Sequence, residues 1–146
     1  MNILLLHKYS IDGMFYGGYY LYMEWEVEYT DEFESWWETL SEKEQISVDA
    51  MVRILERFGP ALAYPYSSAI SSSKCSHMRE LRIQHGGRPL RALYAFDPRR
   101  TAILLIGGDK TGKDNWYRIF VPIADRLYDE HIDQLKKEGI INGDSI

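Results

Sequence analysis

Basic side chains gather in the middle of the chain with a spacing that could hold a phosphodiester. Four arginines fall close together and two lysines follow the next apolar run: Arg79, Arg82, Arg88, Arg91, Lys110 and Lys113. Arginine binds phosphate in a bidentate way and keeps its charge through a reaction. Cross-strand ion pairs or edge protection would explain any one arginine more simply. Convergence of Arg82, Arg91, Lys110 and Lys113 at one end of a sheet would favour a phosphodiester substrate.

A tyrosine follows the lysines and adds a second kind of chemistry. Tyr117 could supply a hydroxyl or a face on which a nucleobase stacks. We expect Lys74, Arg79 and Lys113 to contribute to substrate binding, each as a positive charge near the reacting groups.

The histidines give a weaker signal. His77 precedes the basic segment and is a possible general base, whereas His85 and His131 are expected at the surface. No set of Cys, His, Asp or Glu has the spacing of zinc ligands, so we expect neither a metal nor a cofactor.

A glycine-rich stretch imitates a nucleotide-binding loop. Residues 107–113 read GGDKTGK, but Asp114 stands where a phosphate loop needs Ser or Thr. The preceding strand also ends an antiparallel meander, and a phosphate loop requires a parallel βαβ unit. Nucleotide hydrolysis is therefore disfavoured, and the glycines are expected to form a loop between a strand and a helix.

The charge distribution is uneven although the chain is acidic overall, with a net charge of −5. Residues 24–50 carry ten acidic residues and one lysine, whereas residues 74–118 carry ten Lys or Arg and four acidic residues. A basic middle between acidic flanks is a weak indication of an anionic ligand, and solvated surface charge explains it equally well.

The regular pattern starts at Met23, which could itself be an initiator. We therefore expect residues 1–22 to be an N-terminal extension, flexible or part of a misassigned start, and residues 23–146 to form one domain. The longest apolar runs are too short to span a membrane, and the N-terminus lacks a convincing signal peptide. Cys75 is the only cysteine, which excludes an intrachain disulfide and fits the cytoplasm.

The first half of this domain predicts a strand and two helices. Apolar residues alternate around Val27, Thr30 can cap a first helix, and Ser41 with Glu44 forms a capping box for a second. The second helix is expected to end at Gly59 and to bury Val48, Met51, Leu55 and Phe58. Residues 60–77 are expected to form a loop.

The second half predicts a three-stranded meander over 78–83, 88–97 and 101–106, followed by a helix that starts near Pro122 or is kinked there. The order β-α-α-β-β-β-α indicates an α+β fold, in which a helical hairpin packs on a small antiparallel sheet. The helices are expected on one side of the sheet, which leaves the other side for function.

Several segments together resemble a known family. They are residues 78–82 (MRELR), 91–98 (RALYAFDP), 103–112 (ILLIGGDKTG), 116–117 (WY) and 122–125 (PIAD). They are similar to the RelE/ParE toxin superfamily, and the nearest branch is its HigB-like, phage-derived members. The resemblance covers roughly residues 23–137, and its specific parts are the R-x-x-Y step and the glycine–lysine step.

This resemblance implies a toxin that is neutralised by a co-encoded antitoxin, often a helix-turn-helix protein, and that cuts mRNA in the ribosomal A site without a metal. By position, it implies that Arg82 faces the scissile phosphate and that Arg91 stabilises the transition state. It implies that Lys110 binds phosphate or donates a proton, and that Tyr117 stacks on or orients the nucleotide. The general base stays open, because arginine is a poor base and Glu80 stands where some relatives are basic. Glu80, His77 and Tyr117 are the candidates.

Three functions remain open from the sequence. The first is a ribosome-dependent mRNA endoribonuclease, with little activity expected on free RNA. The second is a ParE-like inhibitor of DNA gyrase without nuclease activity, which would not need Arg91, Lys110 and Tyr117. The third is a non-catalytic domain that binds only its partner, for which the acidic segment 24–50 offers a surface complementary to a basic antitoxin.

Overall fold

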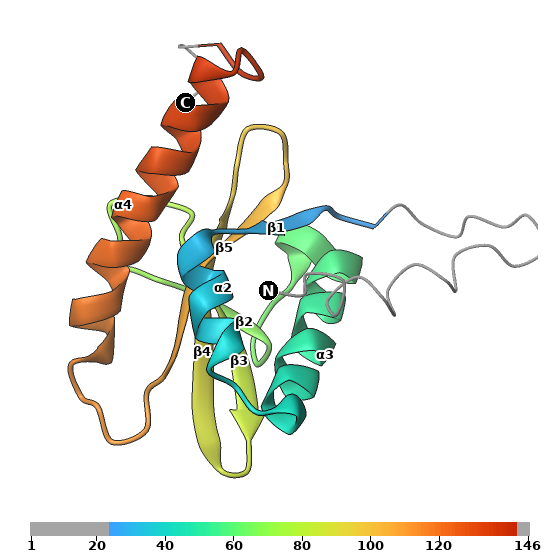
Figure 1. The fold of residues 1–146 in the computed structure, drawn as a ribbon, viewed down its shortest axis with the longest axis vertical. Helices are drawn as coiled ribbons and strands as arrows, with labels where there is room; N and C mark the ends of the chain where they lie inside the picture. The colour runs from blue at the N-terminus through green and yellow to red at the C-terminus, as the bar shows by residue number, and fades with distance from the viewer. Residues whose placement is uncertain (1–23, 143–146) are drawn as a thin grey trace, which may run out of the picture.

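A computed structural model describes residues 24–142 as three helices and a five-stranded sheet (Figure 1). The elements are β1 (Val27–Tyr29), α2 (Asp31–Glu38), α3 (Glu42–Phe58), the short 3-10 helix η2 (Gly59–Ala61), β2 (Ser67–Ala69), β3 (Arg79–His85), β4 (Arg88–Phe96), β5 (Ala102–Asp109) and α4 (Trp116–Lys137). The predicted extension, residues 1–22, lies outside the described residues.

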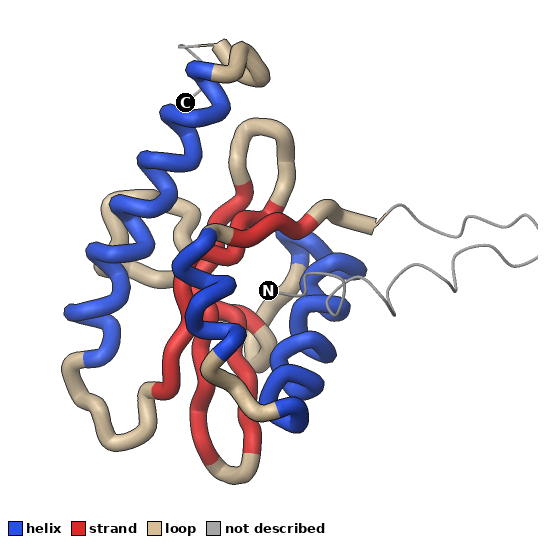
Figure 2. The backbone as a smooth tube through the Cα atoms, viewed as in Figure 1, coloured by secondary structure: helices blue, strands red, loops and turns tan. Residues whose placement is uncertain are grey.

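The sheet confirms the predicted α+β class but is mixed. Its strand order is β1-β5-β4-β3-β2. The pairs β2–β3, β3–β4 and β4–β5 are antiparallel, and β1 is parallel to β5. A parallel pair needs a long crossover, and all the elements between β1 and β5 supply it. The prediction of a plain loop over 60–77 is wrong in one place, because β2 pairs with β3 along the edge of the sheet (Figure 2). Three small residues are too few for alternation to reveal a strand.

The α2–α3 hairpin covers one face of the sheet, as predicted. Thr30 caps α2 by accepting a hydrogen bond from the Phe33 amide, and the Ser41–Glu44 capping box opens α3. The buried residues under the hairpin are Phe33, Trp37, Val48, Val52, Leu55, Leu81, Ile83, Leu90, Tyr94 and Leu104. The expected burial of Phe58 is wrong: its side chain is exposed, and Val52 lies in the core instead because the helix turns its 48–52–55 stripe inward.

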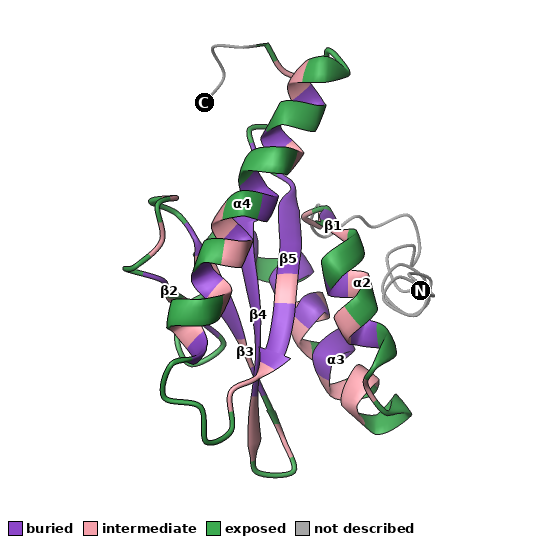
Figure 3. Cartoon of the chain, turned by 60° about the vertical axis from the view of Figure 1, so that its left-hand side comes forward, coloured by how far each residue is buried: buried purple, intermediate pink, exposed green. Residues whose placement is uncertain are grey.

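Helix α4 crosses the opposite face, so the expectation that helices cover only one side is wrong. The face of α4 toward the sheet is buried and its outer face is exposed (Figure 3). The buried residues beneath it include Met78, Leu93, Ile103, Leu105, Trp116, Val121, Ala124 and Leu127. The helix begins at Trp116, and Pro122 lies inside it, where the missing N–H removes one backbone hydrogen bond.

The two glycines of the expected loop belong to the end of β5. A side chain on Gly107 would overlap the ring of Trp36 on α2, and one on Gly108 would lie 2.8 Å from Nε1 of Trp116 on α4. The absence of side chains at Gly107 and Gly108 therefore lets a tryptophan pack directly on each face of the strand. Close packing, rather than phosphate binding, accounts for these glycines.

Candidate active site

The register of the sheet brings four of the predicted site residues together beside the start of α4. Arg82 on β3 lies opposite Arg91 on β4, and Arg91 lies opposite Gly108 on β5. Lys110 follows β5 directly, and its amide donates a 3.0 Å hydrogen bond to the carbonyl of Pro89. Tyr117 occupies the first turn of α4.

Glu80 on β3 is the centre of this cluster. Its Oε1 accepts a 2.6 Å hydrogen bond from the Tyr117 hydroxyl, and its Oε2 accepts one of 2.6 Å from Ser68 on β2. Arg82 approaches Oε2 at 3.4 Å and Arg91 approaches Oε1 at 3.3 Å. Only 5% of Glu80 is exposed, and a buried carboxylate requires such partners to stay charged.

Arg91 lies behind Glu80 and is 4% exposed. One terminal nitrogen donates a 2.9 Å hydrogen bond to the carbonyl of Leu90. Its Nε is near enough to Glu80 for an ion pair, but the two are not aligned as a hydrogen bond, and this nitrogen has no other partner among the described residues. Arg91 therefore neutralises Glu80 from inside the protein and keeps one donor unused.

Tyr117 is held in its protonated form. Burial raises the pKa of its phenol, and the hydrogen bond to Glu80 raises that pKa further, whereas nearby Arg91 acts in the opposite direction without overcoming them. At neutral pH the Tyr117 hydroxyl is therefore a donor of hydrogen bonds and not a base.

Two cation–aromatic pairs flank Glu80. The Lys110 ammonium lies 5.1 Å from the centroid of the Tyr117 ring, and the Arg82 guanidinium lies 5.1 Å from the centroid of the Tyr64 ring. Both distances fall within the range of cation–π attraction, about 6 Å. Glu80 is thus connected to one pair through Arg82 and to the other through Tyr117.

A hollow of about 280 Å³ opens beside this cluster. It is lined by Ala69, Ile70, Ser71, Ser72, Glu80 and Tyr117. The size approaches that of small-ligand pockets, which begin at about 300 Å³. Glu80 and Tyr117 are therefore the two titratable groups of the cluster that line an open space.

The predicted site residues separate into three groups. Arg82, Arg91, Lys110 and Tyr117 come together around Glu80, whereas Lys74 and Lys113 are exposed in loops nearby in the chain. Arg79 points to the opposite face of the sheet, where it donates hydrogen bonds to Ser67 and to the carbonyl of Leu62. The structure therefore does not bring Arg79 to the cluster.

Sequence reasoning missed Ser68, and it weighed Glu80 only as one of three possible bases. Ser68 faces Glu80 because β2 pairs with β3 in a register that sets the two residues opposite each other. The serine-rich composition of residues 67–73 hid that pairing. Side chains alternate along β3, and Leu81 and Ile83 lie on the face beneath the α2–α3 hairpin. This alternation could have placed Glu80 and Arg82 together on the opposite face.

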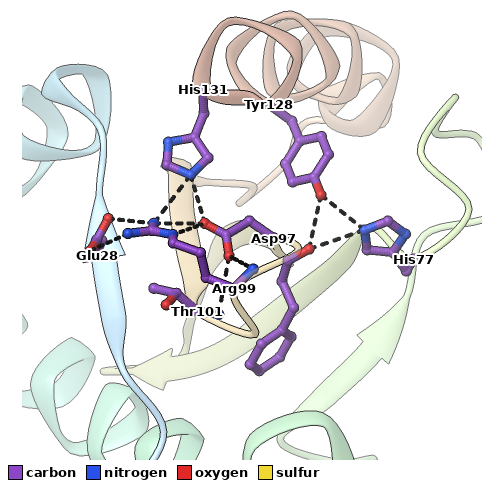
Figure 4. Close-up of polar contacts among 8 residues, drawn as sticks. Glu28, His77, Asp97, Arg99, Thr101, Tyr128 and His131 are labelled. Atoms are coloured by element: carbon purple, nitrogen blue, oxygen red, sulfur yellow. Dashed lines mark hydrogen bonds and ion pairs between the residues drawn. The ribbon is translucent and has the colours of Figure 1, made fainter. Parts of the chain in front are cut away.

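His77 takes part in a second set of polar contacts, between α4 and the end of β4 (Figure 4). Its ring contacts the Tyr128 hydroxyl and the carbonyl of Phe96, at 3.2 and 3.1 Å. Both contacts join His77 to α4 and to the end of β4, and neither joins it to Glu80. Its predicted alternative role as the base therefore finds no support in its position.

Asp97 is the buried centre of a second polar cluster. It accepts hydrogen bonds from Arg99 and from His131 on α4, and Arg99 also donates two hydrogen bonds to Glu28 on β1 (Figure 4). Burial alone would raise the pKa of Asp97, but the hydrogen bonds from His131 and Arg99 outweigh burial and lower it below its ordinary value. The contacts fasten α4 to the β4–β5 turn and to β1.

Residues 24–142 offer neither a metal site nor a membrane-spanning helix. No group of three or more His, Cys, Asp and Glu side chains in this range could hold a metal ion. No helix in this range is long and apolar enough to cross a membrane.

Comparison with protein families gives a match over residues 35–129 to the phage-derived Gp49-like proteins (DUF891). The chain belongs to the Gp49-like family. The Gp49-like segment contains Glu80, Arg82, Arg91, Lys110 and Tyr117, and it leaves out β1 and His131. The whole cluster around Glu80 therefore lies inside the family segment, whereas the Asp97 cluster lies partly outside it.

Two curated relatives of this Gp49-like chain come from Mycobacterium tuberculosis. It is 42% identical to the candidate toxin HigB3 over 94 residues, which are 64% of this chain and 81% of that protein. It is 35% identical to the candidate toxin HigB2 over 108 residues, which are 73% of this chain but only 54% of that protein. The predicted membership of a HigB-like, phage-derived family is confirmed. No solved structure matches the chain.

Proposed function

We propose that this Gp49-like protein is the toxin of a toxin–antitoxin pair and that it cleaves mRNA on the ribosome, in the cytoplasm. Its relatives carry the names of candidate HigB toxins, which supports the toxin role and a co-encoded antitoxin as partner. That this antitoxin is a helix-turn-helix protein stays a prediction. The observation that carries the nuclease role is the Glu80–Tyr117 pair, which lines a hollow. Arg82 pairs with Glu80 and Lys110 lies over the Tyr117 ring, so each member of the pair has a cation beside it.

The proposed reaction is attack of a ribose 2′-hydroxyl on the adjacent phosphorus. The new bond from the 2′-oxygen to phosphorus replaces the bond to the 5′-oxygen, which leaves a 2′,3′-cyclic phosphate and a 5′-hydroxyl. Glu80 takes the proton of the attacking hydroxyl, and Tyr117 gives a proton to the leaving oxygen. The 2.6 Å hydrogen bond between Tyr117 and Glu80 then returns the proton to the tyrosine.

The positive charges stabilise the extra negative charge on the phosphate oxygens in the transition state. Arg82, which pairs with Glu80, and Lys110, which lies over the Tyr117 ring, are partly exposed, so we assign the phosphate contacts to them. Arg91 is a positioning residue in this scheme, because it is buried and acts through Glu80. The transition-state role that the family resemblance implies for Arg91 stays a prediction.

Induced expression of the full chain tests this proposal. We expect growth arrest and new mRNA 5′ ends within reading frames, mapped across the transcriptome. Tyr117→Phe should remove both effects, because it deletes the hydroxyl that faces Glu80 and keeps the ring beside Lys110. Tyr128→Phe is the matched control: it deletes a hydroxyl of similar burial on the same helix, whose bond goes to the Phe96 carbonyl.

Three results would contradict the proposal. Arrest without new 5′ ends, accompanied by a DNA-damage response, would favour gyrase as the target. Unchanged cleavage by Tyr117→Phe would place the chemistry elsewhere in the molecule. Absence of both arrest and cuts, with the protein shown to be folded and free of antitoxin, would leave a purely binding domain.

A further inference from the structure

Tyr64 is the most exposed large hydrophobic side chain of the described residues, with 72% of its surface accessible. It lies in the segment between η2 and β2, at the edge of the sheet nearest to β3. Water contact over most of a tyrosine ring is unfavourable compared with stacking against another flat group. Because Tyr64 lies next to the candidate site, the flat group that stacks on it is expected to belong to the substrate.

Arg82 connects this ring to the site. Its guanidinium lies 5.1 Å from the centroid of the Tyr64 ring and also pairs with Oε2 of Glu80. The backbone holds the segment as well, since the Arg82 amide donates a 2.9 Å hydrogen bond to the carbonyl of Tyr66. Tyr64 is thus one side chain away from the carboxylate that the reaction would use.

Two aromatic rings bracket the cations of the site. From the β2 edge toward α4, the order is Tyr64, Arg82, Arg91, Lys110 and Tyr117, which follows from the strand order and the pairing of Arg82 with Arg91. Single-stranded nucleic acid offers complementary groups, because each phosphate lies between two nucleotides whose bases have flat faces. Proteins that bind single strands combine positive grooves with aromatic platforms.

We propose that Tyr64, oriented by Arg82, is a stacking platform for a nucleobase of single-stranded RNA that flanks the phosphate at Glu80. This inference rests on the proposed nuclease function, because it places the phosphate between Arg82 and Lys110. Stacking on a ring does not distinguish one base from another, so Tyr64 adds affinity for RNA without a sequence preference.

Tyr66 is also exposed, but it contacts Arg82 through its backbone carbonyl and not through its ring. Phe58 has a similar partner, with the Arg57 guanidinium 6.0 Å from its ring centroid, but it ends α3 on the opposite face of the sheet. Phe58 therefore provides a matched control, as an exposed ring near an arginine but away from Glu80.

Binding of a fluorescent RNA that cannot be cut tests the platform. The probe is a single strand of mixed sequence with every ribose 2′-O-methylated, which removes the attacking hydroxyl. We would measure its anisotropy with the full chain at low salt, where phosphate contacts are strongest. Tyr64→Ala should weaken binding about tenfold, while Tyr64→Phe, which keeps the flat ring, stays within about twofold. Phe58→Ala should leave binding unchanged.

A second series of probes, each with one abasic position, tests whether a base is the partner of Tyr64. At one position the abasic probe should bind the wild type as weakly as the intact probe binds Tyr64→Ala. The same probe should lose nothing further with Tyr64→Ala, because ring and base form one interaction.

Three results would overturn the platform. Tyr64→Ala could bind the RNA with full affinity, or the wild type could show no measurable binding. The loss of affinity caused by each abasic position could also simply add to the loss caused by Tyr64→Ala. Loss of antitoxin binding by Tyr64→Ala, with RNA binding intact, would overturn it in favour of a protein contact. A failure of the proposed nuclease function would look different. In that case the wild type would not cleave mRNA, but its RNA binding would still depend on Tyr64.

Discussion

Glu80 and Arg91 form a buried pair in which neither charge can be removed alone without consequences for folding. Both are at most 5% exposed, and breaking such a pair leaves an uncompensated charge at a cost of about 3–5 kcal/mol. Loss of activity in Glu80→Ala or Arg91→Ala would therefore mix chemistry with stability. Tyr117→Phe keeps both charges in place and removes one hydrogen bond to a charged group, which costs about 1.5–3 kcal/mol.

The sequence indicated the cations of the site more clearly than its centre. Arg82, Arg91, Lys110 and Tyr117 stand out because their residue types suit phosphate and nucleotide binding. Glu80 looked like a local partner of these arginines, since nothing along the chain shows that it is buried or that Tyr117 reaches it. Its role depends on packing between β3 and α4, which are far apart in sequence.

A second buried carboxylate, Glu56 on α3, gives a prediction about pH and stability. Burial first, and then repulsion by Glu24 and Asp49, raises the pKa of Glu56 from 4.5 to about 7, although Arg53 opposes this. The folded state therefore binds more protons than the unfolded state between pH 4.5 and about 7, and stability falls as pH rises through that window. We expect Glu56→Gln to be more stable than the wild type at pH 8 by about 3 kcal/mol, and equal to it at pH 4.

Urea unfolding at the two pH values measures this difference. Glu42→Gln is the control, because it neutralises an exposed carboxylate on the same helix and should change stability by less than about 0.5 kcal/mol. An equal gain for Glu56→Gln at pH 4 and pH 8 would show that its ionisation is not the cause.

At the scale of elements, the site depends on helices that pack closely on both faces of β5. Trp36 approaches the strand from α2 and Trp116 approaches it from α4, at Gly107 and Gly108. This double packing sets the start of α4, and with it the position of Tyr117. The glycines and the lysine of this segment therefore have different roles. Gly107 and Gly108 leave room for the two tryptophan rings, and Lys110 follows directly after the end of β5.

Gly107→Ala tests the packing. Its methyl group would overlap the Trp36 ring, so we expect a loss of about 1–3 kcal/mol in the free energy of unfolding, measured with urea. In a Trp36→Leu background the same substitution should cost less than about 0.5 kcal/mol, because the obstructing ring is gone. An undiminished cost in that background would point to backbone strain rather than to overlap.

Local signals predicted the elements better than their arrangement. The caps at Thr30 and Ser41 and the apolar periods located α2, α3 and the meander, since these depend on neighbours in the chain. Two features depend on distant partners and escaped prediction: the parallel pairing of β1 with β5, and the coverage of the second face by α4. The edge strand β2 escaped as well, because its three small residues carry no period.

At the scale of the whole molecule, the charge distribution fits the proposal that the ribosome, and not this chain alone, holds the mRNA for cleavage. The net charge is −5, and the positive groups of the site are few and partly neutralised by Glu80. Non-specific affinity for RNA rises with the number of phosphates that a protein neutralises. Free RNA should therefore bind weakly, whereas a ribosome would hold the mRNA in the orientation that attack by the 2′-hydroxyl requires.

The most direct test of the central claim is cleavage of one defined mRNA by the purified full chain, with the mRNA either free or in the A site of programmed ribosomes. The mRNA would also be made with a single 2′-deoxy nucleotide at the cut position. We predict a 2′,3′-cyclic phosphate and a 5′-hydroxyl from the ribosome-bound mRNA, little cleavage of free mRNA, and none at the 2′-deoxy position. Cleavage that persists at the 2′-deoxy nucleotide, or equal cleavage of free and bound mRNA, would contradict the account.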